Sequence, residues 1–243
     1  MKFFTPEWYN DTIVADMHSQ MRKTQSAAEF SEKFYEKLYK LEKKAFLRHS
    51  KRIAKFSRIK FDAAAAEKQF DANYEENLAF VKANLPAEIL DRVKDIRVLA
   101  LGSAEYDVAA EIERFCGRTE RKCKAAEAAY DEELENVAAI VGWDTVHALD
   151  TLIGSPVESV SVCDNGKITV VTADDPEYPS YTVTLDGAEW LTPDVNVNGS
   201  VIAQHELVRG ENGLLLGILC VGESIGAVAC EFRASKISIA KSV

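Results

Sequence analysis

Apolar residues recur every three or four positions through the first 140 residues, which is the spacing of amphipathic helices. Residues that cap helices stand before several of these stretches, because serine, threonine and aspartate side chains accept bonds from free backbone N–H groups. The pattern predicts a bundle of about five helices: one capped by Thr5, one from near Ser26 to Phe56, one over 63–84 capped by Asp62, a central one, and one from Ser103 to about Ile140.

The central stretch, Leu85–Gly102, is expected to be the most buried helix. Pro86 suits a first helical position, and Gly102 suits the left-handed residue just beyond a helix end. We interpret Asp95 and Arg97 as a structural ion pair rather than as a site held between helices, because structural pairs also perturb charges. The inward positions are expected to be Ile89, Val93, Ile96 and Ala100.

The hydrophobic period changes from 3.6 to 2 near Gly142-Trp143, which indicates strands. Asn165-Gly166 and Asn212-Gly213 each separate two alternating runs, and Asn-Gly is a strong hairpin signal. The fold class is therefore α+β, with a helical part at 1–142 and an antiparallel β meander, sandwich or open barrel at 143–243. Whether the two parts share one core is left open.

Charge is unevenly distributed along the chain, whose formal net charge is −10. Residues 1–145 contain 24 basic and 26 acidic residues, whereas the remainder contains 5 and 13. This acidity argues against a general nucleic-acid binder. The apolar runs are too short to span a bilayer as a helix, and the start lacks a signal-peptide pattern, so we expect a cytoplasmic protein.

Two segments resemble a family of uncharacterised bacterial proteins, classified as a domain of unknown function. They are the opening MKFFTPEWY and the central LPAEILDRVKDIRVLALG. Together with the β-rich tail, the resemblance implies a bacterial, cytosolic protein with a helical N-terminal half and a β-rich C-terminal half. It implies no activity and no site residues.

Each catalytic template that we compared with the chain lacks a required residue. Gly222–Gly226 matches G-x-S-x-G, but no histidine follows Ser224 to complete a hydrolase triad. His205-Glu206 begins H-E-x-x-H, but Arg209 stands at the fifth position. We therefore predict no catalytic residue, no metal ligand and no cofactor. Three of the cysteines are expected to be small buried residues, namely Cys163, Cys220 and Cys230.

One positive feature is the segment Lys43–Lys60, which contains no acidic residue. Phe46, Ile53 and Phe56 lie largely opposite its cations and are expected to anchor it. This basic stripe, Lys44, Arg48, Lys51, Lys55 and Arg58, falls at helical spacing. It is a candidate surface for a nucleic acid, an anionic membrane or an acidic partner. The favoured interpretation is a solvated face balanced by acids of neighbouring helices or of the β part, because the whole protein is acidic.

The leading functional hypothesis is a non-catalytic protein-interaction module whose partner is another protein. A nucleic acid or an anionic membrane, bound through the helix at 43–60, is a less favoured partner. A third hypothesis is an enzyme whose acid and base groups, His147, His205 and Glu206, meet near the interface of the two parts. The oligomeric state cannot be derived from the sequence.

Overall fold

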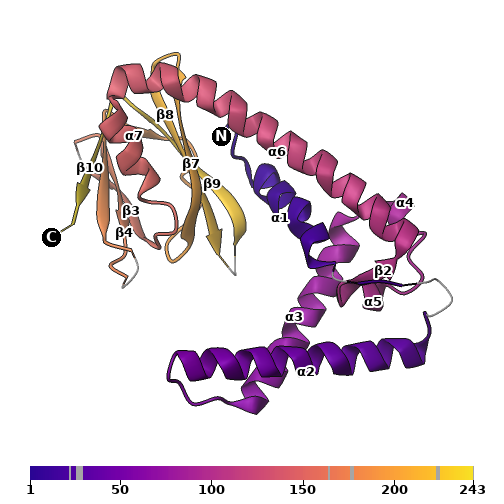
Figure 1. The fold of residues 1–243 in the computed structure, drawn as a ribbon. Helices are drawn as coiled ribbons and strands as arrows, with labels where there is room; N and C mark the ends of the chain where they lie inside the picture. The colour runs from indigo at the N-terminus through magenta and orange to yellow at the C-terminus, as the bar shows by residue number, and fades with distance from the viewer. Residues whose placement is uncertain (22, 26–29, 164, 176–177, 223–224, 243) are drawn as a thin grey trace. The chain divides into compact units, whose positions relative to one another are not determined.

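A computed structural model describes the chain except residues 22, 26–29, 164, 176–177, 223–224 and 243. Two features of the sequence, the predicted helix start near Ser26 and Ser224 of the G-x-S-x-G match, lie outside the described residues. The described part has helices in its N-terminal half and antiparallel strands in its C-terminal half (Figure 1), as an α+β fold requires.

Seven helices are present in the described residues, and side-chain caps begin several of them. Ser31 accepts a hydrogen bond from the Phe34 N–H group, and Asp62 accepts one from Ala65, as predicted for that aspartate. The third helix has the predicted bounds. The helices are α1 (Pro6–Gln20), α2 (Glu32–Phe56), α3 (Ala63–Asn84), α4 (Ala87–Leu90), α5 (Ile96–Ala100), α6 (Tyr106–Val141) and α7 (Trp143–Asp150).

The prediction of one continuous helix over Leu85–Gly102 is wrong, because the segment forms two short helices, α4 and α5. Asp95 adopts an extended backbone with φ −144° and ψ 104°, and its side chain accepts the Arg97 N–H group. An aspartate in this conformation caps a new helix and so cannot continue the preceding one. The predicted Asp95–Arg97 ion pair is confirmed at 2.8 Å, and Gly102 is left-handed, with φ 75°.

Two further boundaries differ from the prediction. Ser103 does not cap a helix but opens β2 (Ser103–Glu105), which pairs in parallel with β1 (Lys23–Gln25). Helical structure also continues past Gly142, whose φ of 85° separates α6 from α7. The C-terminal strands therefore begin at Val157 rather than at Trp143, because residues 143–150 form a further amphipathic helix that buries its own Val146 and Leu149.

The C-terminal strands form two antiparallel sheets that share a hydrophobic core, which is the sandwich among the predicted alternatives. The orders are β10-β5-β4-β3 and β6-β9-β8-β7, and both predicted Asn-Gly hairpins are present. Cys163 is exposed at the end of an edge strand, so its predicted burial is wrong. The strands are β3 (Val157–Cys163), β4 (Lys167–Thr172), β5 (Tyr181–Asp186), β6 (Glu189–Trp190), β7 (Val201–Gly210), β8 (Gly213–Gly222), β9 (Gly226–Ala234) and β10 (Lys236–Lys241).

The chain divides into two compact units. The helical unit is Ile13–Thr119, and the β unit combines Met1–Thr12 with Glu120–Val243. The helical unit has 20 basic and 17 acidic residues, a net charge of +3, whereas the β unit has 9 and 22, a net charge of −13. A domain boundary between residues 142 and 143 stays a prediction. Among the described residues, no helix has the length and apolar character needed to cross a bilayer.

Two substitutions test the division of Leu85–Gly102 into α4 and α5. Val98 is fully buried in α5, whereas Val93 lies half-buried in the turn between the two helices. We expect Val98→Asp to lower the free energy of unfolding by about 3 kcal/mol or more, because it buries an unpaired charge. Val93→Asp should cost about 1 kcal/mol. Chemical unfolding of both variants measures this difference. Equal losses of unfolding free energy would instead support one continuous helix over Leu85–Gly102.

Candidate protein-interaction surface

Aromatic side chains hold α2 against α3. The ring of Tyr39 packs edge-on against Phe70 and Tyr74, with ring centroids 5.3 and 5.2 Å apart. The Tyr39 hydroxyl donates to the Asp71 carboxylate at 2.6 Å, and Lys43 pairs with the same carboxylate at 2.9 Å. These two bonds, from Tyr39 and then from Lys43, lower the pKa of Asp71, while burial raises the pKa of Tyr39. These contacts hold α3 against the N-terminal half of α2.

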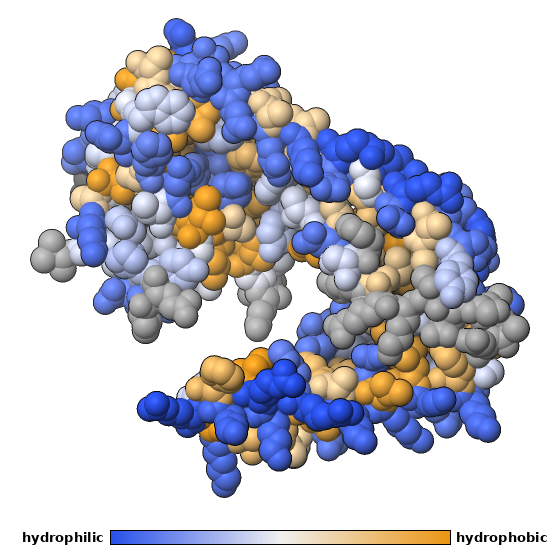
Figure 2. All heavy atoms as spheres, viewed as in Figure 1, coloured by the Kyte–Doolittle hydropathy of each residue, from blue (hydrophilic) through white to orange (hydrophobic). Residues whose placement is uncertain are grey.

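Toward its C-terminus, α2 exposes apolar side chains. Ile53 is 52% exposed and Phe56 is 88% exposed, so the prediction that they anchor the helix is wrong. The physical reason lies in the sequence of α3, whose first four residues, 63–66, are alanines. Alanine side chains are too small to cover a phenylalanine on the neighbouring helix. Figure 2 shows apolar residues at the surface of the α2–α3 hairpin beside strongly hydrophilic ones.

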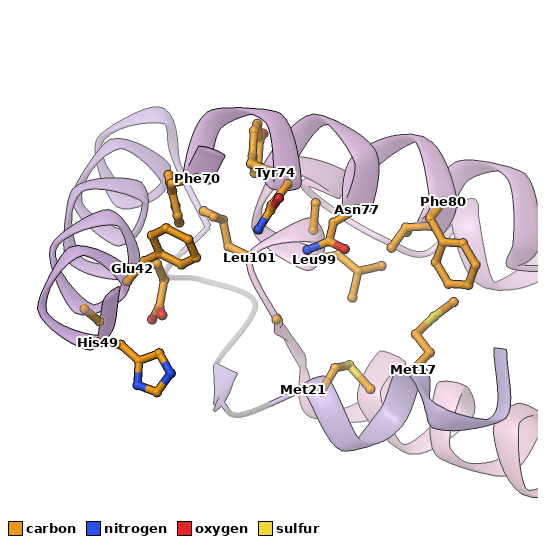
Figure 3. A pocket seen from close by; sticks show the side chains of 16 residues that line it. Met17, Met21, Glu42, His49, Phe70, Tyr74, Asn77, Phe80, Leu99 and Leu101 are labelled. Atoms are coloured by element: carbon orange, nitrogen blue, oxygen red, sulfur yellow. The ribbon is translucent and has the colours of Figure 1, made fainter. Parts of the chain in front are cut away.

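A cavity of about 570 Å³ lies against the same two helices within the helical unit (Figure 3). Its walls are largely apolar, with Phe46 and Phe70 from α2 and α3 and Leu99 from α5. Met17 and Met21 face these helices from the opposite wall. The volume falls within the range of sites that hold a small ligand or bulky side chains. Few polar side chains line it, namely Glu42, His49, Asn73 and Asn77.

The cavity wall and the exposed end of α2 belong to one helix face. Ala45 and His49 line the cavity, and Ile53 and Phe56 follow them at spacings of four and three residues. Residues at such spacing lie above one another on a helix. We call this set, Ala45, His49, Ile53 and Phe56, the apolar face of α2. It begins at the cavity and ends in solvent.

The basic stripe runs along α2 largely on the side away from this apolar face. Its members are exposed, and within the residues that the structure describes none of them forms an ion pair. Lys43, which is not part of the stripe, pairs with Glu67 and Asp71 of α3. Acids of α3 thus pair with Lys43 but not with the basic stripe. The favoured interpretation, that acids of neighbouring helices neutralise the charge of the stripe, therefore gains no support within the helical unit.

Arg58 ends the stripe in a left-handed conformation, with φ 56°. The Ile59 N–H group bonds the Ala54 carbonyl across it, which closes the end of α2. Glycine usually occupies such a position, and a larger residue there costs about 1 kcal/mol. The chain therefore carries a cation at the tip of the α2–α3 hairpin where glycine would be the less strained choice.

The other predicted site residues have separate environments. His147 is exposed on α7, with its ring 5.7 Å from that of Trp143. His205 is buried on β7, and its Nε2 atom lies 3.1 Å from the Asp150 carboxylate. Glu206 is also buried, and backbone N–H groups near the N-terminus occupy its carboxylate. An exposed and a buried histidine do not share one enclosed pocket, so nothing in this arrangement favours the enzyme hypothesis.

Sequence reasoning missed the cavity. None of the lining residues Met17, Met21, Asn73 and Asn77 was predicted to lie at a site. One signal was available: the helical face of α3 that carries Phe70 and Tyr74 also carries two asparagines, which a fully buried face does not favour. The cavity itself arises from the packing of distant segments, for which the sequence has no local signal.

Comparisons with family models, with curated proteins and with solved structures find no match to this chain. This result is consistent with the resemblance to a family of uncharacterised proteins. The helical N-terminal half and the β-rich C-terminal half that the resemblance implies are both present.

The lowered pKa of Asp71 gives the α2–α3 contact a defined pH dependence. Its carboxylate stabilises the folded state above the ordinary aspartate pKa of about 3.9, and this contribution is lost as the pH falls through the lowered value. We expect Asp71→Asn to be less stable than the wild type at pH 7, with a difference that shrinks steadily below about pH 4. Thermal melts of both proteins across this range measure it. If the stability difference between the two proteins did not change with pH, the bonds of the Asp71 carboxylate to Tyr39 and Lys43 would be contradicted.

Proposed function

We propose that this chain is a non-catalytic protein-interaction module of the bacterial cytoplasm, and that its helical unit binds an acidic amphipathic helix of a partner protein. The bacterial and cytoplasmic assignments rest on the resemblance described above. The binding role rests on one observation, that the apolar face of α2 leaves the cavity and continues into solvent at Ile53 and Phe56. Apolar surface of this kind on a soluble protein commonly marks an interaction site.

The chemistry of the surface defines the partner. An amphipathic helix binds a groove by placing apolar side chains from successive turns into it. The cavity can accept such side chains, and Phe56 offers a further contact about two turns beyond His49 on the same helix face. The basic stripe lies on the same helix, largely on the side away from these apolar side chains, so its positive charge would attract a partner helix that carries carboxylates. The net charge of +3 on the helical unit favours approach of an acidic partner.

A polyanion is supported less well as the ligand. Nucleic acid would use the cations but would leave the cavity and Phe56 without a role, and an anionic bilayer cannot fill a concave cavity. We therefore propose the protein partner and treat polyanion binding as an outcome that the test must be able to detect.

A synthetic peptide helix with leucine at every third or fourth position and glutamate beside it can serve as the probe. We expect it to bind the full-length protein more tightly than a scrambled peptide of the same composition, with an affinity that falls between about 50 and 200 mM salt. Phe56→Ser and Lys55→Glu should each weaken binding by about fivefold to tenfold, roughly 1 to 1.4 kcal/mol. Fluorescence anisotropy measures these affinities.

Lys68→Glu is the matched control for Lys55→Glu, because Lys68 is an exposed lysine on the side of α3 away from the cavity. It makes the same charge change and should leave binding almost unchanged. Labelled RNA, duplex DNA and phosphatidylserine vesicles are titrated in parallel. Equal affinity for the scrambled peptide, or tighter binding of a polyanion that Lys55→Glu abolishes while Phe56→Ser does not, would contradict the proposal.

A further inference from the structure

A row of two acids and one glycine crosses the outer face of one sheet in the β unit. Glu206 of β7 pairs with Gly217 of β8, and Gly217 pairs with Glu231 of β9. Its neighbours in β8, Leu216 and Ile218, point into the sandwich core, so Gly217 faces outward. Two carboxylates thus stand on either side of a position without a side chain, which is an arrangement suited to a cationic ligand.

The chain's own first residues occupy this row. The Glu206 carboxylate accepts hydrogen bonds from the backbone N–H groups of Lys2, Phe3 and Phe4, the last two at 2.8 and 3.0 Å. The ammonium group of Met1 lies 2.6 Å from the Glu231 carboxylate. Glu206 is only 2% exposed, and a buried carboxylate is stable only when such donors satisfy it.

Gly217 is required for this close approach. A Cβ atom at this position would collide with the Met1 side chain and would lie 3.1 Å from Cγ of Glu206. Glycine inside a strand weakens the strand, and its presence often marks a place where another part of the chain comes close. The row therefore has space above Gly217 for the first side chain of a peptide. The carboxylates of Glu231 and Glu206 accept bonds from its amino group and from its backbone N–H groups, respectively.

Aromatic contacts fix the orientation of the bound segment. Phe3 and Phe4 pack against Tyr130 of α6, with ring centroids 5.6 and 4.8 Å away. The Tyr130 hydroxyl in turn accepts the Leu207 N–H group of β7 at 3.0 Å. The same strand thus holds both the carboxylate that binds the segment and the tyrosine against which it packs.

We propose that this row, Glu206, Gly217 and Glu231, is a recognition site for an unblocked peptide amino terminus, with residues 1–4 of this chain as its ligand. The ligand class is a primary ammonium followed by three backbone N–H donors and two aromatic side chains. A blocked amino terminus cannot supply the ion pair to Glu231, because acetylation or formylation removes the positive charge. The site therefore distinguishes a free amino group from a modified one.

Full-length protein with a free or an Nα-acetylated Met1 provides the test, with the state of the terminus verified by mass spectrometry. We expect acetylation to lower the melting temperature of the β unit by about 4 °C. It should also speed hydrogen exchange of the Phe3 and Phe4 N–H groups at least tenfold, because the segment leaves its seat more often. The same two measurements are made on the Glu231→Gln variant, in which acetylation should have almost no further effect.

Glu211→Gln is the matched control, because Glu211 is an exposed acid in the β7–β8 turn, outside the row. Acetylation should affect this variant as it affects the wild type. Unchanged melting and exchange in the acetylated wild type would overturn the proposal, and so would an acetylation effect of equal size in Glu231→Gln and in the wild type. Glu231 is about one-third exposed, so its replacement is compatible with folding.

Discussion

The contact of Tyr39 with Phe70 and Tyr74 is the interaction on which the candidate surface depends. It joins α2 to α3 through aromatic packing and through the bonds of Tyr39 and Lys43 to Asp71. Beyond Phe46, Ile53 and Phe56 of α2 are exposed, and α3 begins with four alanines, whose side chains are too small to cover them. The strong contact at one end and the weak cover at the other together orient the apolar face of α2 and keep part of it in solvent.

Ion pairs of α2 lie near the aromatic contact, whereas none is found along the basic stripe among the described residues. Around the aromatic contact, acids and bases of neighbouring segments pair, as Lys43 does with Asp71 and as Arg97 does with Glu32 and Asp95. Along the basic stripe, the described residues supply no such partners. Even exposed ion pairs contribute little to stability, and these cations form none among the described residues. The positive charge of the stripe is therefore not needed to stabilise the fold. The proposed partner binding rests on this combination of unpaired cations and uncovered apolar groups on one helix.

Local signals in the sequence predicted much of the fold. Asp62 marked the start of α3, and Asn165-Gly166 and Asn212-Gly213 marked two hairpins, because caps and tight turns depend on a few adjacent residues. The break at Asp95 was missed because a continuous helical stripe runs across it, and helical spacing alone does not detect an internal cap.

The candidate site was only half predictable. The stripe of cations is a property of one helix and was found from spacing alone. The exposure of Phe56 and the cavity beside Phe70 depend on which residues α3, α5 and the end of α1 bring together, and spacing within α2 does not contain that information. Glu206 was named for its place beside His205, whereas its actual partners are three backbone N–H groups some 200 residues away in the sequence.

Side-chain footprinting of Phe56 in the full-length protein tests the central claim most directly. The account predicts that a diffusing carbene or hydroxyl-radical reagent labels Phe56 strongly in the free protein, since this side chain is almost fully exposed. Labelling should fall when the acidic amphipathic peptide is added, while the exposed Tyr106, at the start of α6, keeps its labelling. A Phe56 that is protected in the free protein, or whose labelling the peptide leaves unchanged, would contradict the account.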